Sequence, residues 1–330
     1  MPRLGRSLLF AMRMLYSAYG LLLDSSFPIE GMTSAARHDS DRLPALLVDQ
    51  RDPAELQEAW SPSGAEPEWH GRLGDGFDFV IERGAGDELL FSYGDRARFR
   101  LQADMSRLDC APIGKDLDWQ RVLISKVIPS ISVMRGYEAL HAASVDSPQG
   151  VVAIMAPSGI GKSTLAGELL GRGWPLFADD QLTLGRSSGA IRAYPGTPHM
   201  NFPAGDAPGA DPESLGSTIA ILGGERWVSV RALTPEPRPV RLLCLLERGS
   251  DLPLRLCTLD SNPLLLAPYM LGLSMDAERQ RTRFDLYADL MDSVALVRLT
   301  GGIEHGPEQF GDLIDEALAQ ASEPATAGAR

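Results

Sequence analysis

The chain has 330 residues, of which 44% are hydrophobic and 23% charged, and a formal net charge of −13. This composition is typical of a globular, soluble chain with two domains or one large one, and its acidic balance excludes the basic surface that a nucleic-acid partner needs. Its cysteines, Cys110, Cys244 and Cys257, lie far apart without a C-x-x-C pair, so we expect buried thiols in a cytoplasmic protein and no structural zinc.

The N-terminal segment loosely resembles a signal peptide, because basic residues precede an apolar stretch from Leu8 to Leu23. Arg13 interrupts that stretch, which is too short and too broken to span a bilayer, so we expect no membrane association. Residues 1–14 are expected to form an N-terminal arm or an upstream extension of the true start. A short helix or arm up to Ser17 should lead into a strand at Tyr19–Leu23.

Residues 15–112 are expected to form a small, mostly-β N-terminal domain. The stretch Gly76–Glu82 alternates apolar and polar residues, as a half-buried strand does. Two strand-like runs, Leu89–Tyr93 and Ala97–Leu101, flank a Gly-Asp-Arg turn and therefore predict a hairpin.

The next segment, residues 113–136, is expected to be a connecting helix that bends or ends near Pro129. The stretch Tyr137–Val145 looks like a strand that pairs with, or neighbours, the strand after it. His141 lies in this stretch. A lone histidine beside apolar residues is more often structural than catalytic, so its spacing alone does not assign it a role.

The most informative stretch, Val151–Asp180, predicts a strand, a phosphate-binding loop, a helix and a second strand. Val151–Met155 is apolar and β-branched, as a buried strand is. The loop and the start of the helix comprise Ala156, Pro157, Ser158, Gly159, Ile160, Gly161, Lys162, Ser163 and Thr164. This order nearly matches the Walker A pattern G-x-x-x-x-G-K-[ST], with Ala156 in place of the first glycine.

The residue types in this loop suit a polyphosphate. Gly159 and Gly161 can adopt a positive φ, so that successive backbone N–H groups point into one concavity at a helix N-terminus. Lys162 would reach the β- and γ-phosphates of ATP, and the Ser163 hydroxyl would hold Mg²⁺. We therefore predict that residues 156–164 bind the nucleotide. The alternative is a Gly-rich turn between a core strand and a helix.

A further strand-like run, Trp174–Ala178, ends in Asp179 and Asp180. Ligands of open α/β sheets lie beyond the carboxyl ends of strands. One carboxylate at such an end can bind Mg²⁺, and the other can accept the proton of an attacking hydroxyl. The alternative is an Asp-Asp turn with solvated side chains.

Together, His141, the loop 156–163 and the Asp pair resemble HPr kinase/phosphorylase, in which a strand histidine, a phosphate loop and two aspartates follow in this order at similar spacing. The resemblance implies an α/β fold with a P-loop kinase core of the HPr kinase/phosphoenolpyruvate carboxykinase type over residues 137–322. It also implies a serine kinase that uses ATP and Mg²⁺.

By position, the resemblance also implies roles for single residues. His141 matches the active-site histidine, and Lys162 is the lysine of the phosphate loop. Asp179 matches the general base that acts on a serine hydroxyl. Asp180 matches the second aspartate, on the metal side with Ser163.

The chain departs from the family after the core, because the Gly-rich second signature is not found. This departure puts phosphorylase activity, the hexamer and HPr itself as acceptor in question. The chain instead resembles the smaller HPr-kinase-like proteins found with ribosomally made peptides, especially lasso peptide tailoring kinases. The weaker patterns that carry this likeness are Tyr19-Gly20, Phe27-Pro28, Pro195–Pro198, Arg283–Asp285 and Val297–Leu299. They imply a precursor peptide as partner, with a serine, often the C-terminal one, as acceptor, and a homo-oligomer as one possible assembly.

The long Pro- and Gly-rich stretch Pro195–Pro212 is expected to be a loop, either a peptide-binding lid or a plain surface loop. Arg279–Ser293 is expected to be an amphipathic helix that turns Phe284, Tyr287, Ala288 and Met291 toward the core. Residues 323–330 are expected to be a flexible tail.

Three functions remain open at this point. The preferred one is an ATP-dependent kinase that phosphorylates a peptide serine. The second is a phosphotransferase whose acceptor is a small molecule or an HPr-like protein, because a phosphate loop cannot name the acceptor. The third is a nucleotide-binding module without turnover.

Overall fold

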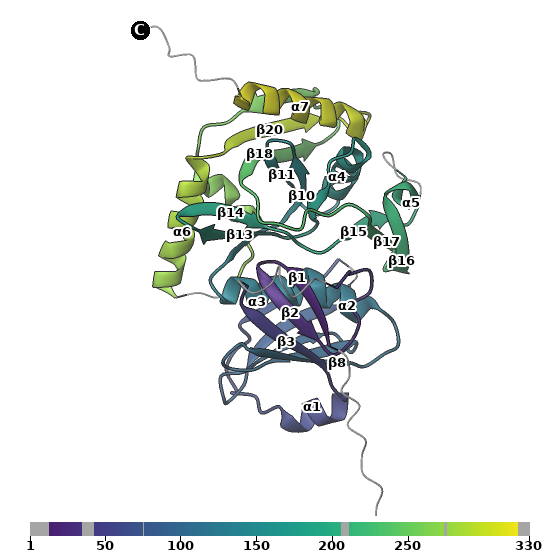
Figure 1. Ribbon diagram of the computed structural model, residues 1–330, viewed down its shortest axis with the longest axis vertical. Helices are drawn as coiled ribbons and strands as arrows, with labels where there is room; N and C mark the ends of the chain where they lie inside the picture. Colours follow the sequence, from purple (N-terminus) through teal and green to yellow (C-terminus); the bar gives the residue numbers. More distant parts are fainter. Residues whose placement is uncertain (1–12, 35–42, 75, 206–210, 274–275, 323–330) are drawn as a thin grey trace, which may run out of the picture.

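The structure, a computed structural model, describes residues 13–34, 43–74, 76–205, 211–273 and 276–322. Figure 1 shows two stacked regions: an eight-stranded sheet that contains the N-terminal strands, and a larger region of smaller sheets flanked by helices. The chain is therefore an α/β protein. The expected tail and all but the last two residues of the expected N-terminal arm lie outside the described residues. Within the described part, no helix is long and apolar enough to cross a membrane.

The eight-stranded sheet has the order β1-β2-β3-β8-β7-β6-β5-β4. Its strands are β1 (Met14–Ala18), β2 (Leu21–Ser25), β3 (Ala45–Gln50), β4 (Trp69–Arg72), β5 (Asp78–Arg83), β6 (Leu89–Tyr93), β7 (Ala97–Leu101) and β8 (Arg107–Pro112). Helix α1 (Pro53–Ala59) follows β3 and is capped by the side chain of Asp52. Leu23, Phe91 and Phe99 are fully buried in the core on one face of the sheet. The predicted hairpin over residues 89–101 is confirmed, since β6 and β7 pair antiparallel.

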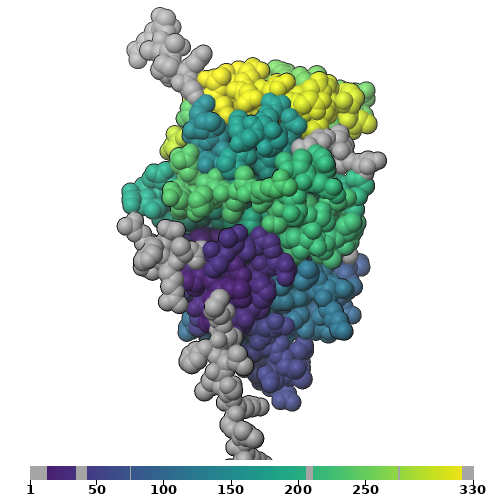
Figure 2. Space-filling model, turned by 45° about the vertical axis from the view of Figure 1, so that its right-hand side comes forward, coloured from purple at the N-terminus to yellow at the C-terminus, as the bar shows by residue number. Residues whose placement is uncertain are grey.

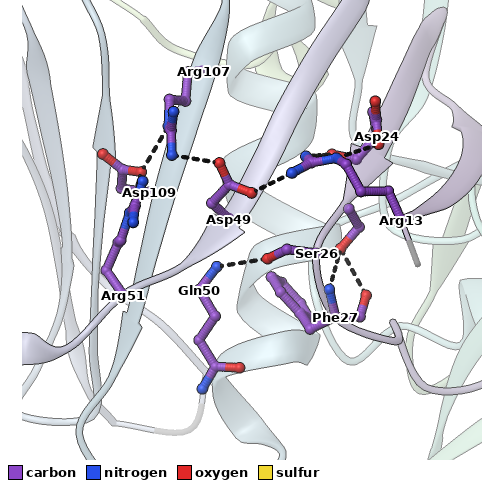
Figure 3. Close-up of polar contacts among 10 residues, drawn as sticks. Arg13, Asp24, Ser26, Phe27, Asp49, Gln50, Arg51, Arg107 and Asp109 are labelled. Atoms are coloured by element: carbon purple, nitrogen blue, oxygen red, sulfur yellow. Dashed lines mark hydrogen bonds and ion pairs between the residues drawn. The ribbon is translucent and has the colours of Figure 1, made fainter. Parts of the chain in front are cut away.

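A series of ion pairs joins the neighbouring strands β3 and β8 of this sheet (Figure 3). The two oxygens of Asp49 lie 2.7 Å from Arg13 Nη1 and 2.6 Å from Arg107 Nη2. Asp109 Oδ1 accepts from Arg107 at 3.0 Å and from Arg51 at 3.1 Å. Burial opposes the ionisation of Asp49, but the two arginines outweigh it and hold its pKa below the usual range. Because most of these side chains are partly exposed, each pair should contribute modestly and weaken with salt.

The prediction of a helix or arm up to Ser17 followed by one strand at Tyr19–Leu23 was wrong, because β1 and β2 form an antiparallel hairpin. Tyr19 and Gly20 have φ of 55° and 77°, so they form the tight turn between β1 and β2. Tyr19 is only 1% exposed, and its N–H donates to the carbonyl of Pro195 at 2.7 Å. This distant partner holds the turn, and the local sequence does not reveal it.

One long helical segment leads from the eight-stranded sheet to the rest of the chain, and it lies between the two regions in Figure 1. It consists of α2 (Asp118–Val122), the π-helical turn η2 (Leu123–Val127) and α3 (Ile128–Met134). Its apolar side chains pack against the core of the sheet. The π turn ends just before Pro129, whose missing N–H and bulky ring cannot continue a regular α-helical ladder. The helical segment therefore does not end near Pro129, as one form of the prediction had it, but continues through it as α3.

The second large sheet has six strands in the order β12-β10-β11-β18-β20-β19. They are β10 (Ala142–Ser147), β11 (Gly150–Met155), β12 (Leu176–Ala178), β18 (Val240–Arg248), β19 (Arg255–Thr258) and β20 (Ala295–Gly301). The central strands β11, β18 and β20 are parallel, and the others pair antiparallel. Helices α4 (Lys162–Gly171) and α7 (Pro307–Ser322) pack in one core cluster of this sheet, and α6 (Ala277–Met291) packs in another. The 3₁₀ helix η3 (Pro263–Tyr269) precedes α6.

A three-stranded sheet of β14-β13-β9 lies beside the six-stranded sheet. Its strands are β9 (Glu138–Leu140), β13 (Leu182–Ser187) and β14 (Ala190–Tyr194). The expected strand Tyr137–Val145 is therefore divided at His141, because β9 pairs with β13 whereas β10 pairs with β11. The change of sheet leaves His141 at a break in the ladder. The expected pairing next to the phosphate-loop strand holds for β10.

A second three-stranded sheet has the order β15-β17-β16. Its strands are β15 (His199–Pro203), β16 (Gly216–Leu222) and β17 (Glu225–Val230), and the short helix α5 (Pro212–Leu215) precedes β16. The prediction of a loop over residues 195–212 was wrong for β15, because Met200 and Phe202 are buried in the core. Figure 2 shows this green segment directly above the purple N-terminal strands, and Trp227 of β17 belongs to the core of the eight-stranded sheet.

Helix α6 confirms the helix predicted at Arg279–Ser293, but not all of the side chains predicted to face the core do so. Tyr287 and Met291 are buried, whereas Phe284 is 50% exposed. The inward side of the first half of the helix is occupied instead by Arg283, whose Nε lies 2.8 Å from the buried carboxylate of Glu138. A charged pair fills the place that the helical spacing predicts for an aromatic side chain.

Candidate active site

The predicted phosphate loop joins the buried strand β11 to the N-terminus of α4. Gly159 and Gly161 have φ of 82° and 105°, in the region that only glycine adopts readily. Gly161 is the N-cap of α4 and makes no side-chain cap, so the first backbone N–H groups of the helix can meet an anion. Ala156 is fully buried in the core cluster beneath the loop, and its methyl group is accommodated where the Walker A pattern has glycine.

The side chain of Lys162 folds over this loop. Its Nζ donates to the carbonyl of Ala156 at 2.9 Å and to that of Pro157 at 3.2 Å, and the residue is 7% exposed. Burial lowers the pKa of Lys162, and the nearby carboxylates of Asp180 and Asp179 partly oppose this shift. A nearly buried ammonium group therefore lies at the loop with its charge available to an anion.

Asp179 faces the first turn of α4 across the end of β12. Its Oδ1 accepts from Ser163 Oγ at 2.9 Å, and its Oδ2 accepts from the backbone N–H of Asn201 at 3.1 Å. Burial raises the pKa of this carboxyl group to about 6, although the hydrogen bonds from Asn201 and Ser163 favour the ionised form. Asn201 lies on β15, and no sequence signal points to it.

Asp180 points toward a different set of groups. Its φ is 71°, and its Oδ2 accepts from Lys126 Nζ at 2.6 Å. Its Oδ1 lies 3.2 Å from His141 Nδ1, which also lies 3.0 Å from the Asp180 carbonyl oxygen. Burial opposes the ionisation of Asp180, but Lys126 and His141 outweigh it and hold its pKa well below the usual range. Lys126 lies in η2, and no sequence pattern predicts that it reaches this cavity.

These groups line one cavity of about 260 Å³. The predicted residues that line it are His141, Ser158, Gly159, Gly161, Lys162, Ser163, Thr164, Asp179 and Asp180. The helix of the N-terminal region contributes Arg121, Val122, Ser125 and Lys126, and the sheet β15-β17-β16 contributes Asn201 and Glu225. Of the remaining predicted residues, Ala156 and Ile160 pack toward the core, and Pro157 contributes its carbonyl to Lys162.

Gly161→Ala should destabilise the loop because a left-handed φ strains any residue with a Cβ. The added methyl would meet only Arg248 Nη1 at 3.6 Å, so the cost is in the backbone rather than in a clash. We expect the free energy of unfolding, measured by urea unfolding, to fall by about 1–2 kcal/mol. Gly114→Ala, at an exposed position with room for a methyl group, is the control. Equal behaviour of the two variants would contradict the strained loop.

No protein-family model matches the chain, and no curated protein matches it either. Among solved structures, the HPr(Ser) kinase/phosphatase from Coxiella burnetii is similar, with 15% sequence identity and a TM-score of 0.33. The similarity covers 56% of this chain and 99% of that one. A likeness at this level names neither an activity nor an acceptor, so both must be inferred from the site itself.

Proposed function

We propose that the protein is an ATP-dependent kinase that transfers the γ-phosphate to a serine hydroxyl of a peptide. The observation that carries the proposal is the meeting of Lys162, Ser163 and Asp179 in one cavity, with backbone N–H groups of the loop on one side and a buried acid on the other. Phosphoryl transfer depends mainly on positioning and on neutralising charge, and these groups supply both.

The donors in the cavity fit a nucleotide that carries Mg²⁺. The Ser163 hydroxyl is a hard oxygen ligand, which this cation prefers. Among the described residues, no group of three or more His, Cys, Asp or Glu side chains could hold a metal ion alone. Nucleotide-bound Mg²⁺ needs only one or two protein ligands, because phosphate oxygens and water complete its shell.

The two aspartates are proposed to have different tasks. Asp179 accepts the proton as the serine oxygen bonds to the γ-phosphorus and the bond to the β-phosphate oxygen breaks, which releases ADP. A pKa of about 6 leaves Asp179 mostly ionised at neutral pH and close to the range that suits a general base. Asp180 was expected on the metal side with Ser163, but its oxygens face Lys126 and His141 while Ser163 contacts Asp179. We therefore propose that Asp180 orients His141.

The choice of a peptide as acceptor rests on the resemblance of the sequence to kinases of ribosomally made peptides. The test is incubation with ATP labelled in its γ-phosphate, Mg²⁺, and two panels of acceptors: serine-containing peptides, including ones that end in serine, and small hydroxyl-bearing metabolites. We expect label on a peptide. Label on a metabolite alone would replace the acceptor, and bound nucleotide with no label on any acceptor would favour a module without turnover.

A further inference from the structure

Lys126 makes the closest link between the helix of the N-terminal region and the proposed catalytic acids. Its Nζ lies 2.6 Å from Asp180 Oδ2, although the two residues are distant in sequence and belong to different regions of the fold. The chain has lysines only at positions 115, 126 and 162, and two of these three, Lys126 and Lys162, line the cavity. Neither the motif nor the resemblance assigns Lys126 a role.

The π turn η2 contains Lys126 and has one face in the core and one face at the cavity. Leu123, Ile124 and Val127 are at most 2% exposed in the core of the eight-stranded sheet, whereas Ser125 and Lys126 line the cavity. A π turn adds one residue to a helical turn, which rotates the residues beyond it by about 100° relative to a regular α-helix. The turn therefore packs its apolar side chains on one side and presents Ser125 and Lys126 to the cavity on the other. Such turns in helices often occur at functional sites.

Asp180 needs a basic partner such as Lys126, because both its backbone conformation and its buried negative charge cost free energy without one. Its φ of 71° lies in the left-handed region, which a residue with a Cβ adopts only when neighbours hold it there. Its carboxylate is largely buried, with one oxygen at Lys126 and the other at His141. Removal of either basic group leaves a buried charge with one partner fewer.

We infer that Lys126 is a positioning residue of the active site, which holds Asp180 directed into the cavity so that Asp180 can orient His141 toward the acceptor. This inference rests on the proposed phosphotransfer. It makes the helix from the N-terminal region a structural part of the active site rather than a connection only. It also predicts that Lys126 acts through Asp180 and has little effect on nucleotide binding.

The experiment compares Lys126→Met, Lys126→Arg and the control Lys115→Met, which removes the same charge from an exposed position. We expect Lys126→Met to lower kcat about 100-fold, as misplacement of a supporting group does, with the Kd for ATP changed less than about threefold. Lys126→Arg should restore part of kcat, and Lys115→Met should match the wild type. Wild-type kcat in Lys126→Met, or no rescue by arginine, would overturn the inference.

A double-mutant cycle tests whether Lys126 acts through Asp180. The variant with both Lys126→Met and Asp180→Asn should be no slower than Asp180→Asn alone, because the lysine has lost its target. Losses that multiply would mean that Lys126 acts independently and would contradict the inference.

A crystal structure of Lys126→Met tests the inference even if the protein phosphorylates nothing. Absence of transfer by the wild type would refute the proposed function alone. In the variant, the Asp180 carboxylate should turn away from the cavity while the contact between Ser163 and Asp179 persists. An Asp180 side chain that keeps its place would overturn the role of Lys126, whatever the activity.

Discussion

Asp179→Asn should lower phosphate transfer about 10³-fold and, at the same time, make the nucleotide-free protein more stable at pH 8. The folded-state pKa is about 6, against an ordinary value of 3.8, because burial disfavours the ionised carboxyl group. Its stability contribution is fully present below pH 3.8 and is lost as pH rises through 6. A shift of about two pKa units corresponds to about 3 kcal/mol at most. Asparagine avoids this loss and keeps an acceptor for Ser163, but its NH₂ group cannot accept from the Asn201 N–H, so the net stabilisation should be smaller than this limit.

Two measurements on Asp179→Asn check this prediction. Transfer of labelled phosphate should fall about 10³-fold, within the range that a general base contributes. Urea unfolding should show a stabilisation at pH 8 that shrinks as the pH is lowered toward 4. Asp95→Asn, at a side chain that is 88% exposed, should change neither quantity. Transfer within tenfold of the wild type would remove Asp179 as the base, and an equal stability difference at all pH values would contradict its raised pKa.

Lys162→Ala should strongly weaken both nucleotide binding and phosphate transfer. The ammonium group lies nearly buried over the loop, bonded to the carbonyls of Ala156 and Pro157, and no other cation lies on the loop itself within the cavity lining. We expect ATP to bind about 100-fold more weakly and transfer to fall about 1,000-fold, because a preorganised charge at the transferring phosphate is lost.

Calorimetry with ATP and the labelled-phosphate assay check the effect of Lys162→Ala. Lys115→Ala is the matched control, since it removes the same charge from an exposed site. An unchanged ATP affinity in Lys162→Ala would mean that the nucleotide binds elsewhere, and the assignment of the loop would be wrong.

The sequence predicts those parts of the site whose structure is determined by residues that follow one another in the chain. The loop works through local backbone geometry, so Gly159 and Gly161 could be assigned a positive φ from the motif alone, and the structure confirms it. The hairpin over residues 89–101 was predictable for the same reason, because alternation and turn residues are local signals.

The parts that escaped the sequence depend on contacts between distant segments. Lys126 and Asn201 enter the cavity from a π turn and from a strand in a Pro- and Gly-rich stretch, and neither has a periodic pattern of its own. The expected strand Tyr137–Val145 is interrupted at His141 because its first part pairs with β13 in one sheet and its second part pairs with β11 in another. Phe284 is exposed because Arg283 pairs with Glu138 on the inward side of its helix.

The division of labour between the two aspartates also depends on tertiary contacts. Sequence places Asp179 and Asp180 side by side at a strand end, where either could face the metal. The structure turns Asp180 through a left-handed φ toward Lys126 and leaves Asp179 at Ser163. Adjacent residues of the same type thus acquire opposite pKa shifts from their surroundings.

A crystal structure with Mg²⁺ and a non-hydrolysable ATP analogue tests the central claim most directly. The account predicts that the polyphosphate lies against the backbone N–H groups of residues 158–164, with the terminal phosphate between Lys162 and Asp179. A nucleotide bound outside this cavity, or a terminal phosphate directed away from Asp179, would contradict it.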